Sequence, residues 1–216
     1  MFSHTGSDSR YSTAGPLRRG RRLPRPQLPV PQLVRFRPEV QGGYRSWWGF
    51  ETLPEVNEET PSYVEFITGV GGVIDTWLRR GAAGFRLDVA DELPDEFIEQ
   101  IRTAVKRVSP EKFLLGEVWE DATTKYGFNQ RRTYLLGKGL DSVMNYPFKN
   151  AVLDFVKGKP AEQAANEILT ICEHYPAPAM DTALNFLSTH DTERALTVIA
   201  DEPANGGAGN GRAAAV

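Results

Sequence analysis

Strand-like and helix-like segments alternate along most of this sequence, and that alternation restricts the fold more than any other feature. The expected strands are short apolar runs, most of which end in polar residues: 85–90, 113–119, 142–145 and 182–191. The expected helices place apolar side chains at helical spacing: 63–80, 92–109 and 161–175. Alternation of this kind is typical of parallel βα units, so we expect an α/β fold.

Polar residues recur at the carboxyl ends of three of these strands. Asp88 ends the first, Glu117 ends the second, and His190 and Asp191 end the last. Arg86 shares a face with Asp88, because residues two apart on a strand project to the same side. Burying two charges is costly unless they are paired, so the two residues form either a structural ion pair or a carboxylate held ionised for chemistry. Recurrence at successive strand ends favours the second interpretation, because the active site of a β/α barrel lies there.

Two carboxylates at neighbouring strand ends indicate glycoside hydrolysis. A retaining glycosidase needs a carboxylate nucleophile and a carboxyl acid/base about 5–5.5 Å apart. Asp88 suits the nucleophile because Arg86 would keep it ionised, and Glu117 suits the acid/base because it follows an apolar run. Asp191 would be a third carboxylate near a cationic transition state.

Five segments, taken in order, resemble signature segments of the alpha-amylase superfamily of glycoside hydrolases. Three carry the polar residues above: GFRLDVADE (84–92), GEVW (116–119) and FLSTHDTE (186–193). The other two are TLPEVN (52–57) and FSHTG (2–6). The resemblance is greatest to the cyclomaltodextrinase, neopullulanase and maltogenic amylase branch.

The resemblance implies a role for each polar residue at the strand ends. Asp88 would be the nucleophile and Arg86 would orient it. Glu117 would be the general acid/base. Asp191 would distort the sugar and stabilise the transition state, and His190 would hydrogen-bond the same ring.

The resemblance also implies substrate contacts outside this group. His4 would contact the sugar on one side of the scissile bond, and Asp91 and Glu92 would lie near the acceptor side. Three tryptophans are candidates for stacking on glucose rings: Trp47, Trp48 and Trp119.

The resemblance covers residues 1–11 and about 44–198, which correspond to the end of strand three through strand seven of the family barrel. The expected fold is therefore a partial TIM (β/α)8 barrel. The expected division of the chain has four parts: 1–11, the end of strand three; 12–43, an aberrant loop; 44–200, the catalytic barrel fragment; and 201–216, a disordered tail.

Residues 12–43 depart from the family pattern. They contain six prolines, seven arginines and one acidic residue, a composition that suits neither a helix nor a central strand. We expect this segment to be disordered or the product of compensating frameshifts. A proline-rich recognition arm or a basic nucleic-acid patch are the alternatives.

The net charge, the cysteine count and the lengths of the apolar runs restrict the binding partners and the cellular location expected of this chain. A net charge of −3 gives no support for nucleic-acid binding, and the single cysteine excludes an internal disulfide. There is no apolar run long enough for a membrane span, and residues 1–10 lack an apolar signal core, so a cytoplasmic protein is expected. We expect no cofactor or metal, because no calcium site can be argued from these residues.

The predicted function is that of a retaining O-glycosyl hydrolase acting on α-glucans of the maltodextrin, cyclodextrin or pullulan type. The alternatives are a transglycosylase of the same superfamily and a non-catalytic carbohydrate-binding remnant. With strands of the family barrel unmatched, we expect the 216-residue chain to be incomplete and inactive by itself.

Overall fold

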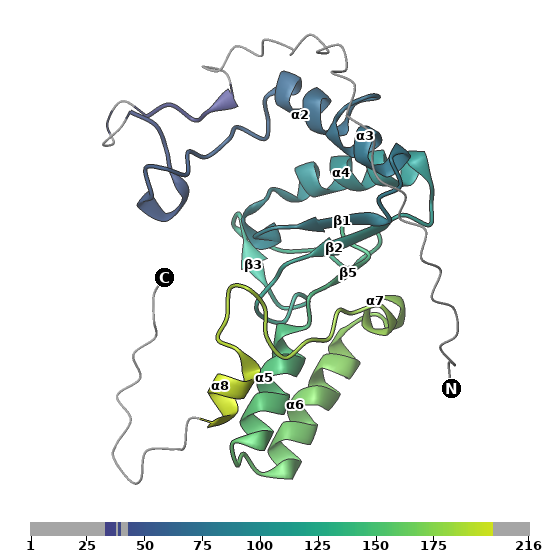
Figure 1. The fold of residues 1–216 in the computed structure, drawn as a ribbon. Coiled ribbons are helices and arrows are strands. Elements are labelled where there is room, and N and C mark those ends of the chain that lie inside the picture. The colour runs from purple at the N-terminus through teal and green to yellow at the C-terminus, as the bar shows by residue number, and fades with distance from the viewer. Residues whose placement is uncertain (1–32, 38, 40–42, 201–216) are drawn as a thin grey trace, which may run out of the picture.

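The structure, a computed structural model, describes residues 33–37, 39 and 43–200 of the chain (Figure 1). The predicted end of strand three at 1–11, the tail at 201–216 and the candidate ligand His4 lie outside these residues. Most of the proline- and arginine-rich segment lies outside them as well.

Three parallel strands form the central sheet: β1 (Gly84–Leu87), β2 (Phe113–Gly116) and β5 (Ser142–Val143). They lie side by side in chain order, with Arg86 beside Leu115 and Gly116 beside Val143. A parallel bridge between Met144 and Leu184 extends the sheet beyond β5. Parallel neighbours in chain order are the arrangement of a β/α barrel, and this part of the chain forms one sector of it.

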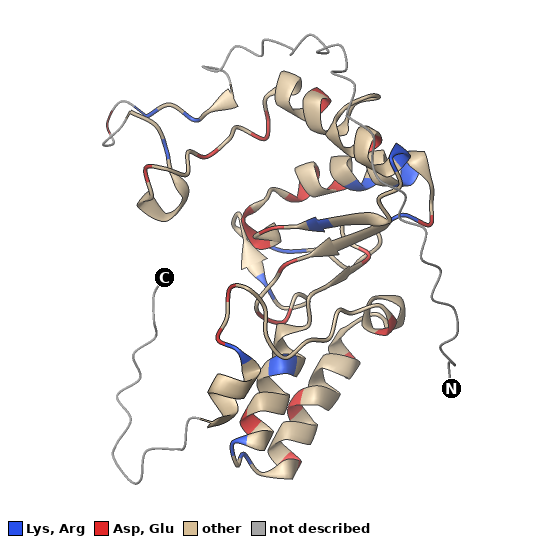
Figure 2. Cartoon of the chain, viewed as in Figure 1, with Lys and Arg blue, Asp and Glu red and all other residues tan. Residues whose placement is uncertain are grey.

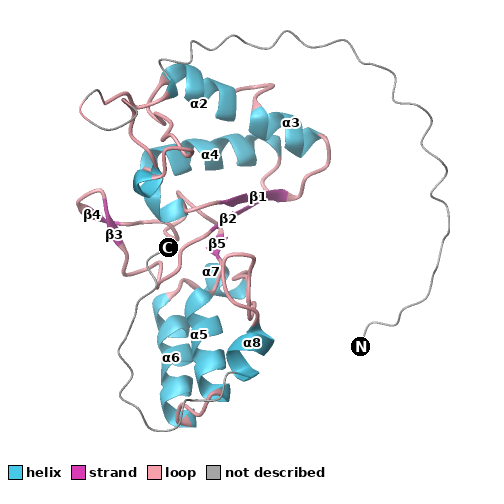
Figure 3. Ribbon diagram, turned by 60° about the vertical axis from the view of Figure 1, so that its left-hand side comes forward, coloured by secondary structure: helices cyan, strands magenta, loops and turns pink. Residues whose placement is uncertain are grey.

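Helices lie on both sides of this sheet (Figures 1 and 3). Those on the β1 side are α2 (Pro61–Thr68), α3 (Val73–Arg79) and α4 (Asp95–Val108). Those on the β5 side are α5 (Tyr146–Val156), α6 (Ala161–His174), α7 (Ala177–Asp181) and α8 (Ala195–Ala200). The remaining elements are short: η1 (Trp47–Gly49), η2 (Ala90–Glu92), β3 (Tyr126–Gly127) and β4 (Gln130–Arg131). Among the described residues, every helix is too short or too polar to cross a bilayer.

Helix α4 forms where the sequence predicts it, because its apolar residues fall on one face. Phe97, Ile98, Ile101 and Val105 are buried against β2 and α3 in the main core. The first turn carries the acidic residues Asp95 and Glu96, and the last turn carries two basic residues. This distribution of charge complements the helix dipole.

The predicted helix over 63–80 is wrong as a single element, because the GVGG sequence at 69–72 divides it into α2 and α3. Gly71 has a φ of 78°, in the left-handed region that a helix interior does not use. A Cβ on Gly72 would lie 2.7 Å from the carbonyl oxygen of Phe66. The break leaves Val70, an apolar residue inside the predicted helix, 76% exposed.

All four predicted strands are shorter in the structure, and the one expected over 142–145 is reduced to β5, followed by the bridge at Met144. β1 ends at Leu87, because Val89 adopts a left-handed φ of 44°, and β2 ends at Gly116. The strand predicted over 182–191 is reduced to the bridge at Leu184. After Leu184, backbone N–H groups donate to threonine hydroxyl groups instead of to a neighbouring strand. The Thr189 N–H donates to Thr192 Oγ1, and the Asp191 N–H donates to Thr189 Oγ1.

Asp141 joins α4 to β2 at the edge of the core. Its carboxylate accepts hydrogen bonds from Arg102 at 2.7 Å, from Lys106 at 2.8 Å and from the backbone N–H of Leu114 at 2.8 Å. Burial alone would raise the pKa of Asp141, but these hydrogen bonds outweigh burial and hold the pKa below its ordinary value. Asp141 therefore stabilises the fold in its ionised form.

Replacing Asp141 by asparagine should lower the free energy of unfolding by about 1–3 kcal/mol near pH 7. A depressed carboxyl pKa contributes stability above the unfolded-state value of about 3.9, and this contribution is lost as the pH falls through the lower folded-state value. The difference between wild type and variant should therefore shrink below about pH 4. Urea unfolding followed by circular dichroism between neutral and acidic pH measures it.

The matched control is Asp181→Asn, at an exposed position at the end of α7. It should leave the free energy of unfolding within about 0.5 kcal/mol of wild type. A difference between wild type and Asp141→Asn that stays constant across the whole pH range would contradict the assignment.

Candidate active site

One guanidinium contacts two of the candidate catalytic carboxylates. Arg86, on β1, binds Asp88 Oδ1 through Nη1 and lies 2.9 Å from Glu117 Oε1 through Nη2. Its Nε donates to the sulfur of Met144 at 3.4 Å. Because β1 and β2 are adjacent parallel strands, their carboxyl ends bring Asp88 and Glu117 to the same edge of the sheet.

Glu117 is buried at this edge, with only 4% of its surface exposed. Its Oε2 accepts a hydrogen bond from the backbone N–H of Val89 at 2.9 Å. Its Oε1 accepts hydrogen bonds from Trp119 Nε1 at 3.0 Å and from the Tyr146 hydroxyl at 3.4 Å. Both oxygens are therefore engaged, which fixes the side chain in one orientation.

The turn after Asp88 curves around Glu117. Val89 is a β-branched residue in the left-handed region, where such residues are rare and strained. This conformation aims its N–H at Glu117, and the N–H of Ala90 donates to the Glu117 carbonyl at 3.0 Å. Strain of this kind gathers at functional sites.

Asp88 differs from Glu117 in exposure. The sequence led us to expect a buried face for Arg86 and Asp88, but the Asp88 side chain is 74% exposed and the Arg86 side chain 28% exposed. The expectation is wrong for Asp88, because β1 ends before it and the side chain projects beyond the sheet. An exposed carboxylate beside a buried one leaves room for a substrate at Asp88.

Tyr146 connects Glu117 to the third carboxylate. This residue begins α5 and is 1% exposed, with its ring stacked on Trp119 at a centroid distance of 4.8 Å. Burial raises the pKa of Tyr146, a hydrogen bond with Thr189 opposes the rise, and the charge of Glu117 adds to it. The charge of Asp191 also raises the pKa of Tyr146, so Asp191 lies within electrostatic reach of the same hydroxyl.

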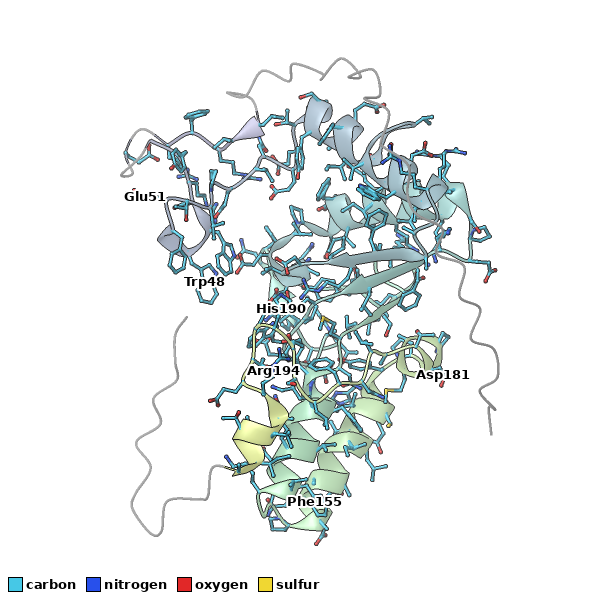
Figure 4. The ribbon with its side chains drawn as sticks, in the orientation of Figure 1. Trp48, Glu51, Phe155, Asp181, His190 and Arg194 are labelled. Carbon is cyan, nitrogen blue, oxygen red and sulfur yellow. The ribbon has the colours of Figure 1, made fainter. Side chains whose placement is uncertain are left out.

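His190 and Asp191 lie in the loop between the Leu184 bridge and α8. His190 Nε2 is 3.3 Å from Asp191 Oδ2, and both side chains are exposed, the histidine by 77%. Figure 4 shows His190 at the carboxyl end of the sheet, on the same side as Trp48, whereas Asp181 lies near the opposite end. The structure therefore brings the two predicted residues to the strand ends, on the Tyr146 side of Glu117.

Asp91 and Glu92 lie in η2, directly beyond Asp88, where acidic residues gather at the start of α4 (Figure 2). Asp91 binds Lys125 Nζ at 2.9 Å. Glu92 accepts hydrogen bonds from the indole N–H groups of Trp47 and Trp48, each at 2.7 Å. With Asp88, they line a cleft of about 910 Å³ between η2 and the segment 45–58.

Arg132 fixes the position of η2, and sequence reasoning missed it. Its side chain is fully buried, and its guanidinium donates to the carbonyl oxygens of Asp91 and Leu93, each at 2.6 Å, and to Asp95 Oδ1 at 2.8 Å. Tyr146 was also missed. The sequence could have indicated Tyr146, because it directly follows the strand predicted at 142–145, just as Glu117 follows an apolar run.

Residues 39–208 match the family described as "Alpha amylase, catalytic domain". A cyclomaltodextrinase of a Bacillus species is 36% identical over 154 residues, which are 69% of this chain and 25% of the relative. An amylopullulanase of Thermoanaerobacter thermohydrosulfuricus is 31% identical over 244 residues, covering 95% of this chain and 16% of the relative.

Among solved structures, the cyclic alpha-maltosyl-(1→6)-maltose hydrolase of Arthrobacter globiformis, in complex with its named ligand, superimposes with a TM-score of 0.69 at 28% identity. The match covers 79% of this chain and 37% of that one. The chain thus spans a quarter or less of the two relatives above and just over a third of this enzyme. With more than three quarters of its residues in the family match, the chain belongs to the alpha-amylase catalytic-domain family of O-glycosyl hydrolases.

Proposed function

We propose that this chain acts as a retaining glycoside hydrolase on α-glucans, with Asp88 as the nucleophile and Glu117 as the general acid/base. The observation that carries the proposal is the contact of one Arg86 guanidinium with both carboxylates. Contact with the same guanidinium keeps the two carboxylates near each other, which is compatible with the separation of about 5–5.5 Å in a retaining enzyme.

The burial of the two carboxylates supports their different roles. Asp88 is exposed and paired with a cation, which suits a carboxylate that attacks the anomeric carbon as an anion. Glu117 is buried and held at both oxygens, which suits a group that delivers a proton to the leaving oxygen and later withdraws one from water.

The third carboxylate and its neighbours would stabilise the reacting sugar. Asp191 and His190 lie on the Tyr146 side of the carboxylate pair, where a negative charge would stabilise an oxocarbenium-like transition state. Trp119, stacked on Tyr146 and 47% exposed, offers an aromatic face next to Glu117.

The substrate class comes from the relatives. Their names are amylopullulanase, cyclomaltodextrinase and cyclic alpha-maltosyl-(1→6)-maltose hydrolase, which refer to glucans. Because these glucans share α-linked glucose, α-glucan oligosaccharides are the proposed substrates of this chain. The expectation that the chain is inactive by itself stays a prediction, and it competes with the activity proposed here. Glycosylation of Asp88 or turnover of an activated substrate by the wild-type chain would contradict that expectation.

Covalent trapping tests for glycosylation of Asp88. The full 216-residue chain is incubated with 5-fluoro-α-glucosyl fluoride, whose reactive leaving group allows glycosylation while the ring fluorine slows release of the sugar. Peptide mapping by mass spectrometry should find one added sugar, on the peptide that contains Asp88.

Two controls accompany the trapping experiment. The heat-unfolded chain should remain unlabelled, because labelling depends on the folded site, and Asp181→Asn should be labelled like wild type. A label on any carboxylate other than Asp88, or a folded chain that takes up no label, would overturn the assignment of the nucleophile.

A further inference from the structure

The guanidinium of Arg86 has a third contact that the proposed mechanism does not use. Its Nη1 binds Asp88 and its Nη2 lies 2.9 Å from Glu117 Oε1, whereas its Nε–H donates to the sulfur of Met144 at 3.4 Å. A thioether sulfur is a weak acceptor, but it can accept a hydrogen bond. Each of the three nitrogens therefore has its own partner: two carboxylates and one thioether.

The contact with Glu117 is close, but it does not fix the orientation of the guanidinium. Nη2 is buried and, among the described residues, has no acceptor aligned for a hydrogen bond, although Glu117 Oε1 is only 2.9 Å away. A Coulombic attraction depends on distance, whereas a hydrogen bond also depends on angle. Asp88 is largely exposed, so packing does not hold it in place. Of the three contacts, the one at Nε is left to set the orientation of Arg86.

Met144 is suited to set that orientation because its own position is fixed. It lies directly beyond β5 and is 7% exposed. Its backbone N–H donates to the carbonyl of Gly116 at 2.9 Å, and a parallel bridge joins it to Leu184 on the other side. Its side chain packs in a small core cluster that includes Tyr146. A thioether held in this way offers Arg86 an acceptor that does not move.

Packing alone would also explain a methionine at this position. Methionine commonly fills irregular gaps in cores and packs well beside aromatic rings. Packing does not explain why the sulfur lies against the Nε–H of Arg86, because leucine fills nearly the same volume and offers no acceptor. Substitution by leucine therefore separates the two explanations.

We propose that Met144 is a positioning residue for the reaction: its thioether holds the Nε–H of Arg86 and thereby turns the two Nη groups toward the carboxylates. The inference rests on the proposed roles of Asp88 and Glu117 and adds a residue that acts only through Arg86. Met144 lies outside the lining of the cleft beside Asp88, so substrate binding does not depend on it. Loss of its sulfur should lower the rate of the chemical step and leave KM unchanged.

The first test observes Arg86 itself by nuclear magnetic resonance and needs no turnover. In the full 216-residue chain with nitrogen-15-labelled arginine, the Nε–H signal of Arg86 is identified by its absence from Arg86→Lys. Met144→Leu should raise the rate at which this proton exchanges with water about tenfold, because one hydrogen bond is lost. The substitution conserves volume, so the midpoint of urea unfolding should change little.

The second test measures the release of fluoride from α-maltosyl fluoride. Met144→Leu should lower kcat about tenfold, because a misplacement of about 1 Å in a reacting group can cost up to about 10²-fold in rate. KM should stay within about twofold of the wild-type value. A residue with a merely structural role would not change kcat alone in a chain that remains folded.

The matched control is Met180→Leu. Met180 lies on α7, where it is partly buried against the main core. It precedes Asp181, which Figure 4 places near the opposite end of the sheet from His190. The same substitution there should leave both the exchange rate of the Arg86 Nε–H and kcat unchanged.

The two tests separate the inference from the proposed function. Equal exchange rates of the Arg86 Nε–H in Met144→Leu and wild type would overturn the inference, and so would an unchanged kcat or equal losses of kcat in Met144→Leu and Met180→Leu. If the wild-type chain is unlabelled at Asp88 and releases no fluoride, the proposed function fails. The exchange rates then decide by themselves whether Met144 orients Arg86.

Discussion

Asparagine at position 88 should lower the rate of fluoride release from α-maltosyl fluoride by about 10⁴-fold or more, to the limit of a fluoride electrode. The amide is nearly the same size as the carboxylate but carries no charge and is a poor nucleophile. Because Asp88 is largely exposed, the substitution should leave the free energy of unfolding near that of wild type. A loss of fluoride release without a loss of unfolding free energy would show that Asp88 has a chemical role and is not merely part of a structural ion pair.

Glutamine at position 117 provides the comparison. Fluoride leaves without much help from an acid, so Glu117→Gln should reduce the initial burst of fluoride release far less than Asp88→Asn does, whereas later turnover also needs Glu117 as the base that activates water. With maltotetraose, whose leaving oxygen needs a proton, the loss should be about 10²–10⁴-fold. Equal losses on both substrates would refute the acid/base role, and fluoride release by Asp88→Asn at the wild-type rate would refute the nucleophile.

Replacing Arg132 by methionine should reduce the free energy of unfolding by about 3–5 kcal/mol, the typical cost of removing one partner of a buried ion pair. Methionine retains most of the volume, so the effect reports the lost polar contacts rather than a cavity. Asp95 would lose its partner, and the carbonyl oxygens of Asp91 and Leu93 would lose their donor. The guanidinium also lies 4.4 Å from the ring centroid of Tyr134, a cation–π contact that would be lost.

The neighbouring residue gives a matched control for Arg132. Arg131 is exposed, and its side chain donates to the carbonyl of Thr123 at 2.7 and 2.9 Å. Arg131→Met should therefore change the free energy of unfolding by no more than about 0.5 kcal/mol. Urea unfolding of both variants measures the difference, and equal stability would show that burial of Arg132 has no energetic consequence.

The spacing of apolar residues predicted those helices and strands whose structure is determined by their own segment of the sequence. Helix α4 and strand β2 form within the ranges expected from their periodicity, and β1 begins one residue before its expected range. The recurrence of Asp88 and Glu117 at strand ends predicted that they would meet, and the structure joins them through Arg86. The inference holds for parallel strands because their carboxyl ends lie at the same edge of the sheet.

Features that depend on distant residues were not predictable in this way. Arginine is a residue type that is usually exposed. The burial of Arg132 depends on carbonyl groups about 40 positions away in the sequence, which accept its hydrogen bonds. The engagement of Glu92 by two indoles joins residues 44 and 45 positions apart. The break at 69–72 was visible as three glycines, but the apolar spacing around it outweighed that signal. The cytoplasmic location and the role of His4 stay predictions.

In the proposed reaction, the summed charge of Asp88, Glu117 and the Arg86 guanidinium between them stays the same from one step to the next. At the start, an ionised Asp88, a protonated Glu117 and Arg86 sum to zero. After glycosylation Asp88 is an uncharged ester and Glu117 is the anion, and the sum is again zero. The negative charge passes from one Nη contact of Arg86 to the other, so the surrounding dipoles need little reorganisation between the two halves of the reaction.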